Sequence, residues 1–96
     1  MSVSVSTHVL DTAAGAPVAG MPVELHRADE QIARTTTDAD GRARLAEELG
    51  AGTYRLVFHP RSPFFRRVEL EIELEDGNYH VPLLVSPYSC VTYRGS

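Results

Sequence analysis

The sequence predicts an all-β protein, an antiparallel β-sandwich of about seven or eight short strands. Apolar and polar residues alternate in short runs, turn-forming residues separate these runs roughly every eight to twelve residues, and almost no segment has helical periodicity. The chain has 96 residues, of which 43% are hydrophobic, a size and composition typical of one globular domain. We therefore expect a single domain over residues 1–96.

The predicted strands of the first half are residues 3–10, 21–26, 32–37 and 43–45. Strict alternation in the first strand places His8 on its less apolar face. Pro22 places the second strand at or near a sheet edge, because proline has no backbone N–H to donate. The third strand ends at Asp38-Ala39-Asp40-Gly41, where Asp side chains and a glycine suited to positive φ favour a tight turn. Arg42 leaves this turn directly.

The predicted strands of the second half are residues 54–58, 68–75, 79–85 and 88–93. Before them, residues 46–50 are expected to form a single helical turn closed by Gly50. The strand at 68–75 alternates four aliphatic residues with four Glu, so one face packs on a core and the other meets water. Asp76-Gly77 is a hairpin signal between this strand and the one that follows it.

Charge and composition argue against several classes of partner. A net charge of −4 disfavours nucleic acid and anionic membranes, since binding to either requires positive charge. No apolar run approaches the roughly eighteen residues that cross a bilayer. Residues 1–5 do not resemble the start of a secretory signal, so we expect a cytoplasmic protein. The one cysteine, Cys90, cannot form an internal disulfide and is expected to be a small buried thiol.

His8 and His80 are candidate acid–base residues, because imidazole exchanges protons near neutral pH. A single histidine on a strand is ordinarily a surface or satisfied core residue, so neither receives a role by itself. His26 is expected to be an exposed strand residue and His59 a loop residue, without a function. Zinc held by His8 and His80 lacks a third ligand at a convincing spacing, which predicts a site without metal or cofactor.

Several motifs stand out in order along nearly the whole chain. They are Ser6-Thr7-His8-Val9-Leu10-Asp11-Thr12, Asp40-Gly41-Arg42, Tyr79-His80-Val81-Pro82-Leu83-Leu84, and the C-terminal Ser86-Pro87-Tyr88 and Tyr93-Arg94-Gly95-Ser96. Together they resemble the 5-hydroxyisourate hydrolase family, the transthyretin-like enzymes of urate degradation. The Tyr-Arg-Gly-Ser segment is the most specific motif, because transthyretin itself lacks it.

The resemblance implies a prealbumin-like (transthyretin-like) sandwich of two four-stranded sheets, with two strand-paired dimers forming a homotetramer. Active sites in this family lie in the channel at the dimer–dimer interface. The implied activity opens the ring amide of a small molecule, 5-hydroxyisourate, to 2-oxo-4-hydroxy-4-carboxy-5-ureidoimidazoline in purine degradation. Matched by position, the implied catalytic residues are His8, Arg42, His80 and Ser96, and the implied substrate-binding residues are Tyr93, Arg94 and Gly95.

These residue types suit the implied hydrolysis. A neutral imidazole, of His8 or His80, can deprotonate a water and direct it at the ring carbonyl carbon. Arg42 would stabilise the negative charge that develops on the carbonyl oxygen and orient the planar substrate. Ser96 would position the water through its hydroxyl or a chain-terminal carboxylate, while Tyr93 and Arg94 would shape the pocket and anchor the tail.

The chain departs from the family pattern in two places. Members usually carry a short helix between the strands here ending at His59 and starting near Phe65, where this chain has only residues 60–64. The helix is therefore expected to be lost and the fold kept. Cys90 and Val91 occupy positions where an aromatic residue and a serine are common.

A non-catalytic binding or structural module is the alternative interpretation. Residues 37–45 and 52–56 also resemble the prealbumin-like modules that serve as stalks and adhesion domains in surface proteins. Many of those modules use a lysine for an internal isopeptide crosslink, and this chain contains no lysine. A transthyretin-like carrier would share the fold but would not need His8, His80 and the terminal tetrapeptide together.

Overall fold

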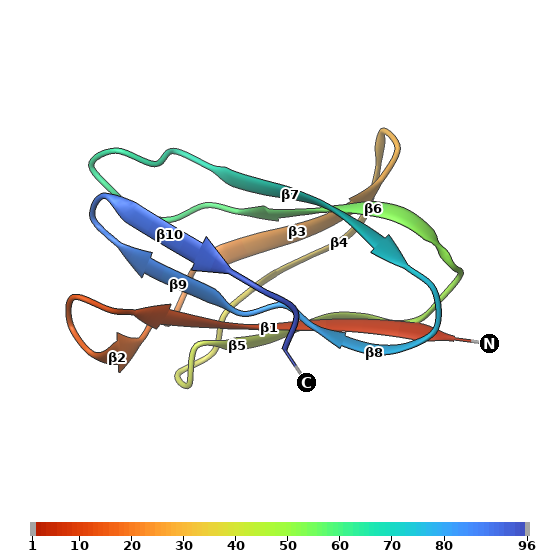
Figure 1. Ribbon diagram of the computed structural model, residues 1–96, viewed down its shortest axis with the longest axis horizontal. Coiled ribbons are helices and arrows are strands. Elements are labelled where there is room, and N and C mark those ends of the chain that lie inside the picture. The colour runs from red at the N-terminus through yellow and green to blue at the C-terminus, as the bar shows by residue number, and fades with distance from the viewer. Residues whose placement is uncertain (1, 96) are drawn as a thin grey trace.

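The computed structural model describes residues 2–95, which form ten short strands in two layers (Figure 1). The strands are β1 (Val3–Asp11), β2 (Ala16–Pro17), β3 (Pro22–Arg27), β4 (Glu30–Thr36), β5 (Arg42–Leu49), β6 (Gly52–Phe58), β7 (Val68–Leu74), β8 (Gly77–His80), β9 (Leu83–Ser86) and β10 (Ser89–Thr92). Residues 2–95 contain no helix, including the short segment 59–67 where one was expected to be lost. The prediction of an all-β sandwich is confirmed.

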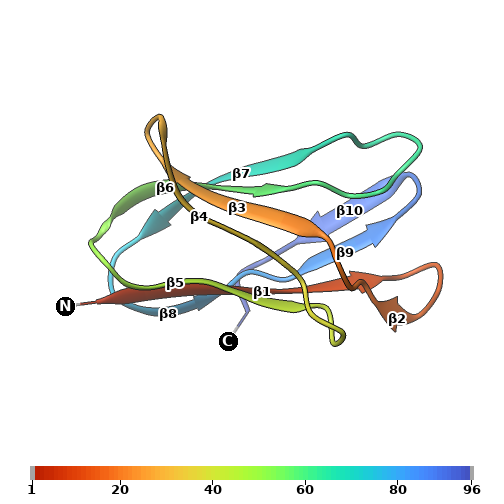
Figure 2. The ribbon, with the colours of Figure 1, turned by 180° about the vertical axis from the view of Figure 1, so that it is seen from behind.

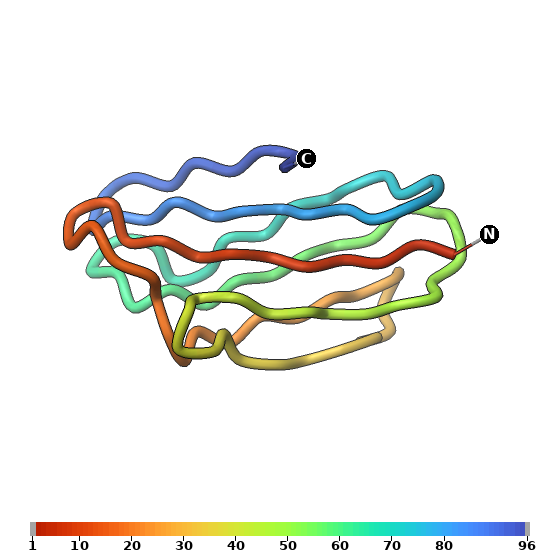
Figure 3. The backbone as a smooth tube through the Cα atoms, turned by 90° about the horizontal axis from the view of Figure 1, so that it is seen from below, coloured from red at the N-terminus to blue at the C-terminus, as the bar shows by residue number. Residues whose placement is uncertain are grey.

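β1 is the centre of a six-stranded sheet, so the expectation of two four-stranded sheets is wrong for this layer. Along one side it pairs antiparallel with β5 and β2, and along the other it pairs parallel with β8 and β9. Figure 3 shows β1 running the length of the sheet between these neighbours, with β10 beyond β9. The second sheet has the order β4-β3-β6-β7 and is antiparallel throughout. Figure 2 shows this sheet stacked over β1, β5 and β8.

Alternate positions of the facing strands supply the core between the two sheets. In β1 the odd-numbered positions from 3 to 9, three valines and Thr7, are buried, as the alternation predicted. The Thr7 hydroxyl donates to the Val81 carbonyl oxygen at 2.6 Å, which satisfies this polar group inside the core. The largest fully buried side chains from the other strands are Leu25, Tyr54, Leu56, Phe58, Leu74 and Leu83. The even-numbered side chains of β1 therefore face outward.

The prediction of a helical turn at residues 46–50 is wrong, because β5 continues as a strand to Leu49. Backbone pairing with β1 explains the difference: Ala46 lies opposite Val5, and Leu49 opposite Val3. The pairing is irregular here, and Glu48 has a φ of 57°. A strand at this place has a partner for its backbone groups, which an isolated helical turn would not have.

The prediction of a hairpin at Asp76-Gly77 is also wrong. β7 belongs to the four-stranded sheet and β8 to the six-stranded sheet, so this turn carries the chain from one layer to the other. Gly77 has a φ of 91°, which its missing side chain permits, and its N–H donates to the Ser2 carbonyl oxygen at 3.2 Å. The strand expected at residues 79–85 divides into β8 and β9, and both pair with β1.

β3, which begins at Pro22, is not itself an edge strand but lies next to the edge strand β4, so the prediction of a place near a sheet edge is met. Pro22 is the first residue of β3, a position where a missing N–H interrupts no ladder. Its carbonyl oxygen accepts from the His59 N–H at 3.1 Å, which extends the pairing of β3 with the chain leaving β6.

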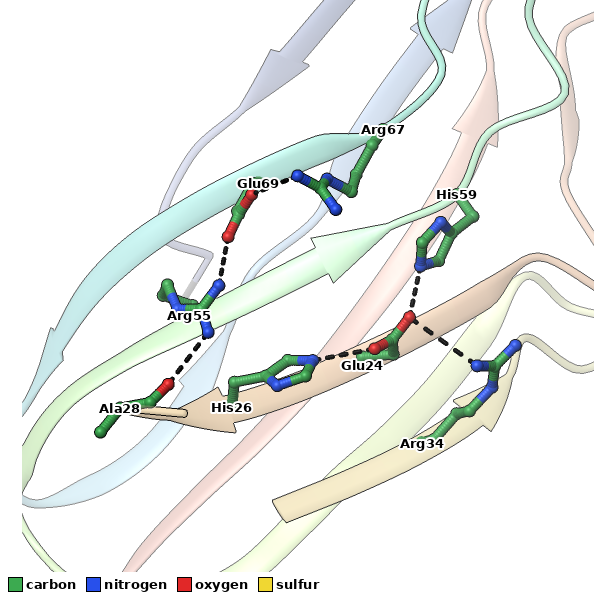
Figure 4. Close-up of polar contacts among 8 residues, drawn as sticks. All are labelled: Glu24, His26, Ala28, Arg34, Arg55, His59, Arg67 and Glu69. Atoms are coloured by element: carbon green, nitrogen blue, oxygen red, sulfur yellow. Dashed lines mark hydrogen bonds and ion pairs between the residues drawn. The ribbon is translucent and has the colours of Figure 1, made fainter. Parts of the chain in front are cut away.

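A polar network covers the outer face of the four-stranded sheet (Figure 4). The Glu24 carboxylate accepts hydrogen bonds from His26 Nε2 at 2.8 Å and from His59 Nε2, and lies 3.9 Å from the Arg34 guanidinium. The His26 bond, the His59 bond and the nearby positive charges hold the pKa of Glu24 below its usual value. His26 is 18% exposed, so the expectation of an exposed residue is wrong. Both histidines anchor this surface through Glu24.

Candidate active site

The predicted histidines and Arg42 meet on the outer face of the six-stranded sheet. His8 on β1 lies opposite Arg42 on β5, and Ser6 on β1 lies opposite His80 on β8. Because residues directly opposite each other share a sheet face, all four side chains emerge on the outward side of β1. A pocket on this face is lined by Ser6, Thr7, Thr35, Thr36, Asp38, Arg42, Ala43, Arg44 and His80.

His8 is oriented by the turn that precedes β5. Its Nε2 lies 2.8 Å from the carbonyl oxygen of Asp40. A carbonyl oxygen only accepts, so Nε2 carries the hydrogen and Nδ1 is the nitrogen left to exchange a proton. The turn itself is held by Asp38, whose carboxylate accepts from the N–H groups of Asp40 and Arg42 at 2.9 Å each. The same turn therefore positions His8 and starts the strand that carries Arg42.

Gly41 allows this turn to lie close to β1. It has a φ of 77°, its carbonyl oxygen accepts from the Val9 N–H at 2.7 Å, and its own N–H donates to the Asp38 carbonyl oxygen at 2.9 Å. A Cβ built at this position would overlap the carbonyl oxygen of Val9. Only glycine fits both the backbone angle and the space, and Arg42 follows immediately with an exposed side chain.

His80 is half-buried at the end of β8, and its Nδ1 lies 2.9 Å from the Ser6 hydroxyl oxygen. Burial, followed by the charges of Arg42 and His8, holds the pKa of His80 below the ordinary histidine value of 6.5. The imidazole is therefore neutral at neutral pH. A neutral, partly shielded imidazole beside a guanidinium is suited to accept a proton.

The C-terminal segment reaches this site through Gly95. Its N–H donates to the His80 carbonyl oxygen at 2.6 Å, and Figure 3 shows the end of the chain beside the β8–β9 segment. The Arg94 guanidinium lies over the Tyr79 ring, 4.4 Å from its centroid, which is a cation–π contact. Tyr93 is 54% exposed and, with Arg94, lines a groove between β7 and β10.

The structure thus brings four of the seven predicted site residues together: His8, Arg42, His80 and Gly95. Tyr93 and Arg94 lie in the adjoining groove and do not line the pocket beside His80. Ser96 lies outside the described residues. The catalytic and binding roles of all seven remain predictions.

Three contributors to the site were missed by the sequence reasoning. Ser6 bonds His80, the Asp40 carbonyl bonds His8, and the Tyr79 ring supports Arg94. Alternation within the first strand already placed Ser6 on the face of His8, so it could have been found. The other two depend on pairing between distant segments, which a single sequence does not reveal.

Neither a cluster of metal ligands nor a membrane-spanning helix occurs among the described residues. Among residues 2–95, no group of three or more His, Cys, Asp or Glu side chains is placed to hold a metal ion. No helix there is long and apolar enough to cross a bilayer. Cys90 is half-buried, and burial raises the pKa of its thiol, which disfavours a reactive thiolate.

Comparisons with known proteins identify the family to which the chain belongs. Residues 5–95 match the model of the HIUase/Transthyretin family. The chain is 43% identical to the 5-hydroxyisourate hydrolase of Caulobacter vibrioides, with 95% of this chain and 96% of that protein covered. That alignment spans 111 positions, more than the 96 residues of this chain, so the relative carries residues that this chain lacks.

Two solved structures show the same architecture. The structure of Klebsiella pneumoniae 5-hydroxyisourate hydrolase superposes with a TM-score of 0.90 at 33% identity, with 98% of this chain and 99% of that chain covered. Sea bream transthyretin in complex with thyroxine superposes with a TM-score of 0.86 at 28% identity, with 95% and 93% covered. The fold is shared by a hydrolase and by a protein solved in complex with thyroxine, so the side chains of the site must distinguish the two.

Proposed function

Because the chain belongs to the HIUase/Transthyretin family, we propose that it is a hydrolase that opens the ring amide of 5-hydroxyisourate to 2-oxo-4-hydroxy-4-carboxy-5-ureidoimidazoline. The observation that carries the proposal is the pairing of a half-buried His80 with Arg42 and His8 on one sheet face. A carrier of an apolar ligand has no need for a neutral imidazole held beside a guanidinium. Such an imidazole suits an enzyme that activates water by general-base catalysis.

His80 takes a proton from water in the proposed first step, because the lowered pKa keeps its imidazole neutral at neutral pH. The resulting hydroxide adds to the ring carbonyl carbon. Arg42, which is exposed beside His80, stabilises the negative charge that develops on the carbonyl oxygen. The reaction proceeds without a metal ion or cofactor.

Ring opening follows when the carbon–nitrogen bond of the tetrahedral intermediate breaks. The leaving ring nitrogen needs a proton, which the imidazolium of His80 returns. His8, with Nε2 fixed by the Asp40 carbonyl, presents Nδ1 to the substrate or the attacking water. Ser96 positions that water, and Tyr93, Arg94 and Gly95 form the adjoining wall. One water is consumed, and the carbonyl carbon becomes the carboxyl group of the product.

Assembly into a cytoplasmic homotetramer is part of the proposal. β7 and β10 end their sheets, and the groove between them exposes apolar side chains of β7 together with Tyr93. Pairing of these strands with a second copy would cover the groove, and a second dimer would face the outer surface that carries His8 and His80. Light scattering at several protomer concentrations tests this, and a monomer would contradict it.

The activity is tested by following the ultraviolet absorbance of freshly made 5-hydroxyisourate, corrected for spontaneous decay. The protein should accelerate the loss, and His8→Ala, His80→Ala and removal of Ser96 should each slow it by at least about a hundredfold. Near-normal rates in all three variants would contradict the assignment of the site residues. Absence of any acceleration by the unaltered protein would favour a binding or structural module instead.

A further inference from the structure

We propose that Ser6 is a positioning residue that fixes the tautomer of His80. Its hydroxyl oxygen accepts the hydrogen on Nδ1, which leaves Nε2 as the unprotonated nitrogen that receives the proton from water. The catalytic meaning of this assignment rests on the proposed function. The tautomer itself is a property of the protein that can be measured without substrate.

Strand pairing holds the two residues in place. Ser6 lies opposite His80 in the parallel ladder of β1 and β8, and the Ser6 carbonyl oxygen accepts from the Val81 N–H at 2.9 Å. On the core side, the Thr7 hydroxyl donates to the Val81 carbonyl oxygen at 2.6 Å. The backbone beside His80 is therefore tied to β1 on both sides, and the Ser6 Oγ to His80 Nδ1 distance of 2.9 Å follows from this register.

A serine hydroxyl can donate or accept, so the distance alone does not give the direction of the bond. The proton transfer to His80 gives the direction of this hydrogen bond. Once His80 has taken a proton, both ring nitrogens carry hydrogens, and Ser6 can stay bonded to Nδ1 only as an acceptor. A Ser6 that accepts from the start keeps its bond through the whole step, without rotation of the hydroxyl.

The opposite edge of the ring faces Gly95 of the C-terminal segment. A Cβ built on Gly95 would lie 2.9 Å from His80 Cδ2, the carbon bonded to Nε2. Because residue 95 has no side chain, the tail places only backbone atoms beside this edge of the ring. Among the described residues Nδ1 has Ser6 as its partner and Nε2 has none, so Nε2 is the nitrogen that the proposal assigns to water or substrate.

The two histidines then present different nitrogens. The Asp40 carbonyl fixes the hydrogen of His8 on Nε2, whereas Ser6 fixes that of neutral His80 on Nδ1. The charged or titratable groups around His80 are His8 on β1, Arg42 and Arg44 on β5, and Asp38 before β5. None of them is placed within hydrogen-bonding distance of the His80 ring, so Ser6 is the partner that selects its tautomer among the described residues.

Nitrogen chemical shifts of the His80 ring test the assignment in the full-length protein. Neutral His80 should show a protonated Nδ1 and an unprotonated Nε2, and the reverse pattern would overturn the proposal. Ser6→Ala should move the titration of His80 to lower pH, because an accepting oxygen stabilises the imidazolium. A donating Ser6 would stabilise the neutral ring instead, so a shift to higher pH, or no shift, would also overturn it.

Kinetics of matched variants complete the test. Ser6→Ala should lower kcat/KM about five- to tenfold, and Ser6→Thr, which keeps the hydroxyl, should restore most of it. Ser4→Ala is the control, because Ser4 lies on the same face of β1 and bonds Asn78, opposite it on β8. Equal rates for the Ser6→Ala and Ser4→Ala proteins would contradict the proposal. An inactive wild type would contradict the proposed function alone, since the nitrogen chemical shifts would still give the tautomer of the His80 ring.

Discussion

The ring of His80 lies against the backbone of Gly95, whose N–H donates to the His80 carbonyl oxygen at 2.6 Å. This contact joins the C-terminal segment to β8 as an isolated bridge. A Cβ at residue 95 would lie 2.9 Å from Cδ2 and 3.1 Å from the carbonyl oxygen of His80. The tail is therefore tied to the backbone of His80, and no room is left for a side chain at residue 95 beside the imidazole.

Gly95→Ala should lower kcat/KM by roughly ten- to a hundredfold, because the added methyl group displaces the ring or the tail by a fraction of an ångström or more. The free energy of unfolding should change little, since Gly95 lies at the chain end and outside the core. Gly50→Ala is the control, because a Cβ there meets only the Arg27 guanidinium at 3.7 Å. Equal activity of the two variants would show that the bridge does not position His80.

Arg42→Lys should reduce kcat/KM by about tenfold or more, although the positive charge is kept. A lysine ammonium cannot form the two parallel hydrogen bonds that a guanidinium makes to a planar, oxygen-rich ligand. Arg44→Lys is the matched control: Arg44 lines the same pocket but pairs with Glu47 at 2.8 Å. A loss of similar size in both variants would indicate a general charge effect rather than substrate contact.

Tyr79→Leu should weaken the anchoring of the tail, because it removes the ring beneath Arg94. Cation–π contacts of this kind contribute roughly 0.5–2 kcal/mol, so we expect a two- to thirtyfold loss of kcat/KM. Tyr79→Phe keeps the ring and loses only the hydroxyl, which accepts from the Glu75 N–H at 3.1 Å. Its activity should stay near that of the wild type, and a Phe variant as impaired as the Leu variant would assign the effect to the hydroxyl.

The pH profile should reflect the lowered pKa of His80. As the pH falls and the base becomes protonated, the midpoint of the decline in kcat/KM should lie below 6.5, the ordinary histidine value. Arg42→Gln should move the titration of His80 to higher pH, because it removes a positive charge that opposes the imidazolium. Ring proton shifts give this titration directly. Arg66→Gln, in the loop before β7, should leave it unchanged.

Glu24→Gln should destabilise the fold by about 1–2 kcal/mol at pH 7, because the His26 and His59 donors lose a charged acceptor that is only 13% exposed. For a domain of this size the melting temperature should fall by roughly 5–15 °C. Glu71→Gln, on the solvent face of β7, is the control and should change little.

The stability difference between wild type and Glu24→Gln should depend on pH with a definite sign. The pKa of Glu24 is depressed in the folded state, so its contribution is complete above the unfolded value near 4.5 and is lost as the pH falls through the folded value. Urea unfolding at a fixed protomer concentration measures this. A difference that is constant from neutral pH to below the folded-state value would exclude Glu24 as the titrating group.

Alternation predicted the strands reliably where one face is buried. β1 and β7 follow the expected pattern residue by residue, because burial of every second side chain is imposed by the pleat. Pairing was harder to predict, since Asp76-Gly77 has the composition of a hairpin turn and yet joins two layers. A turn sequence favours a reversal of the chain but does not say which sheet the next strand enters.

The sequence motifs predicted which residues form the site. They did not predict the hydrogen bonds within it. His8, Arg42 and His80 are far apart in the sequence, and β1 brings them together by pairing with β5 on one side and β8 on the other. The hydrogen bonds that orient the two imidazoles come from Ser6 and from a backbone carbonyl. Backbone acceptors carry no residue-type signal, so such contacts are visible only once the register is known.

The turn at residues 38–41 also limits how the length of this chain can vary. Inserting or removing one residue there would shift the pairing of β5 with β1 by one position. Because strand side chains alternate, the side chain of Arg42 would then point into the core and no longer toward His80. The Asp40 carbonyl would leave His8 in the same event. The segment 60–67 carries none of the predicted site residues and leaves the His59 contact with Glu24 intact, so it can be shortened or extended without changing the register of the site. Loop grafting and size reduction should therefore be attempted there, at the far end of β6, and not at the turn before β5.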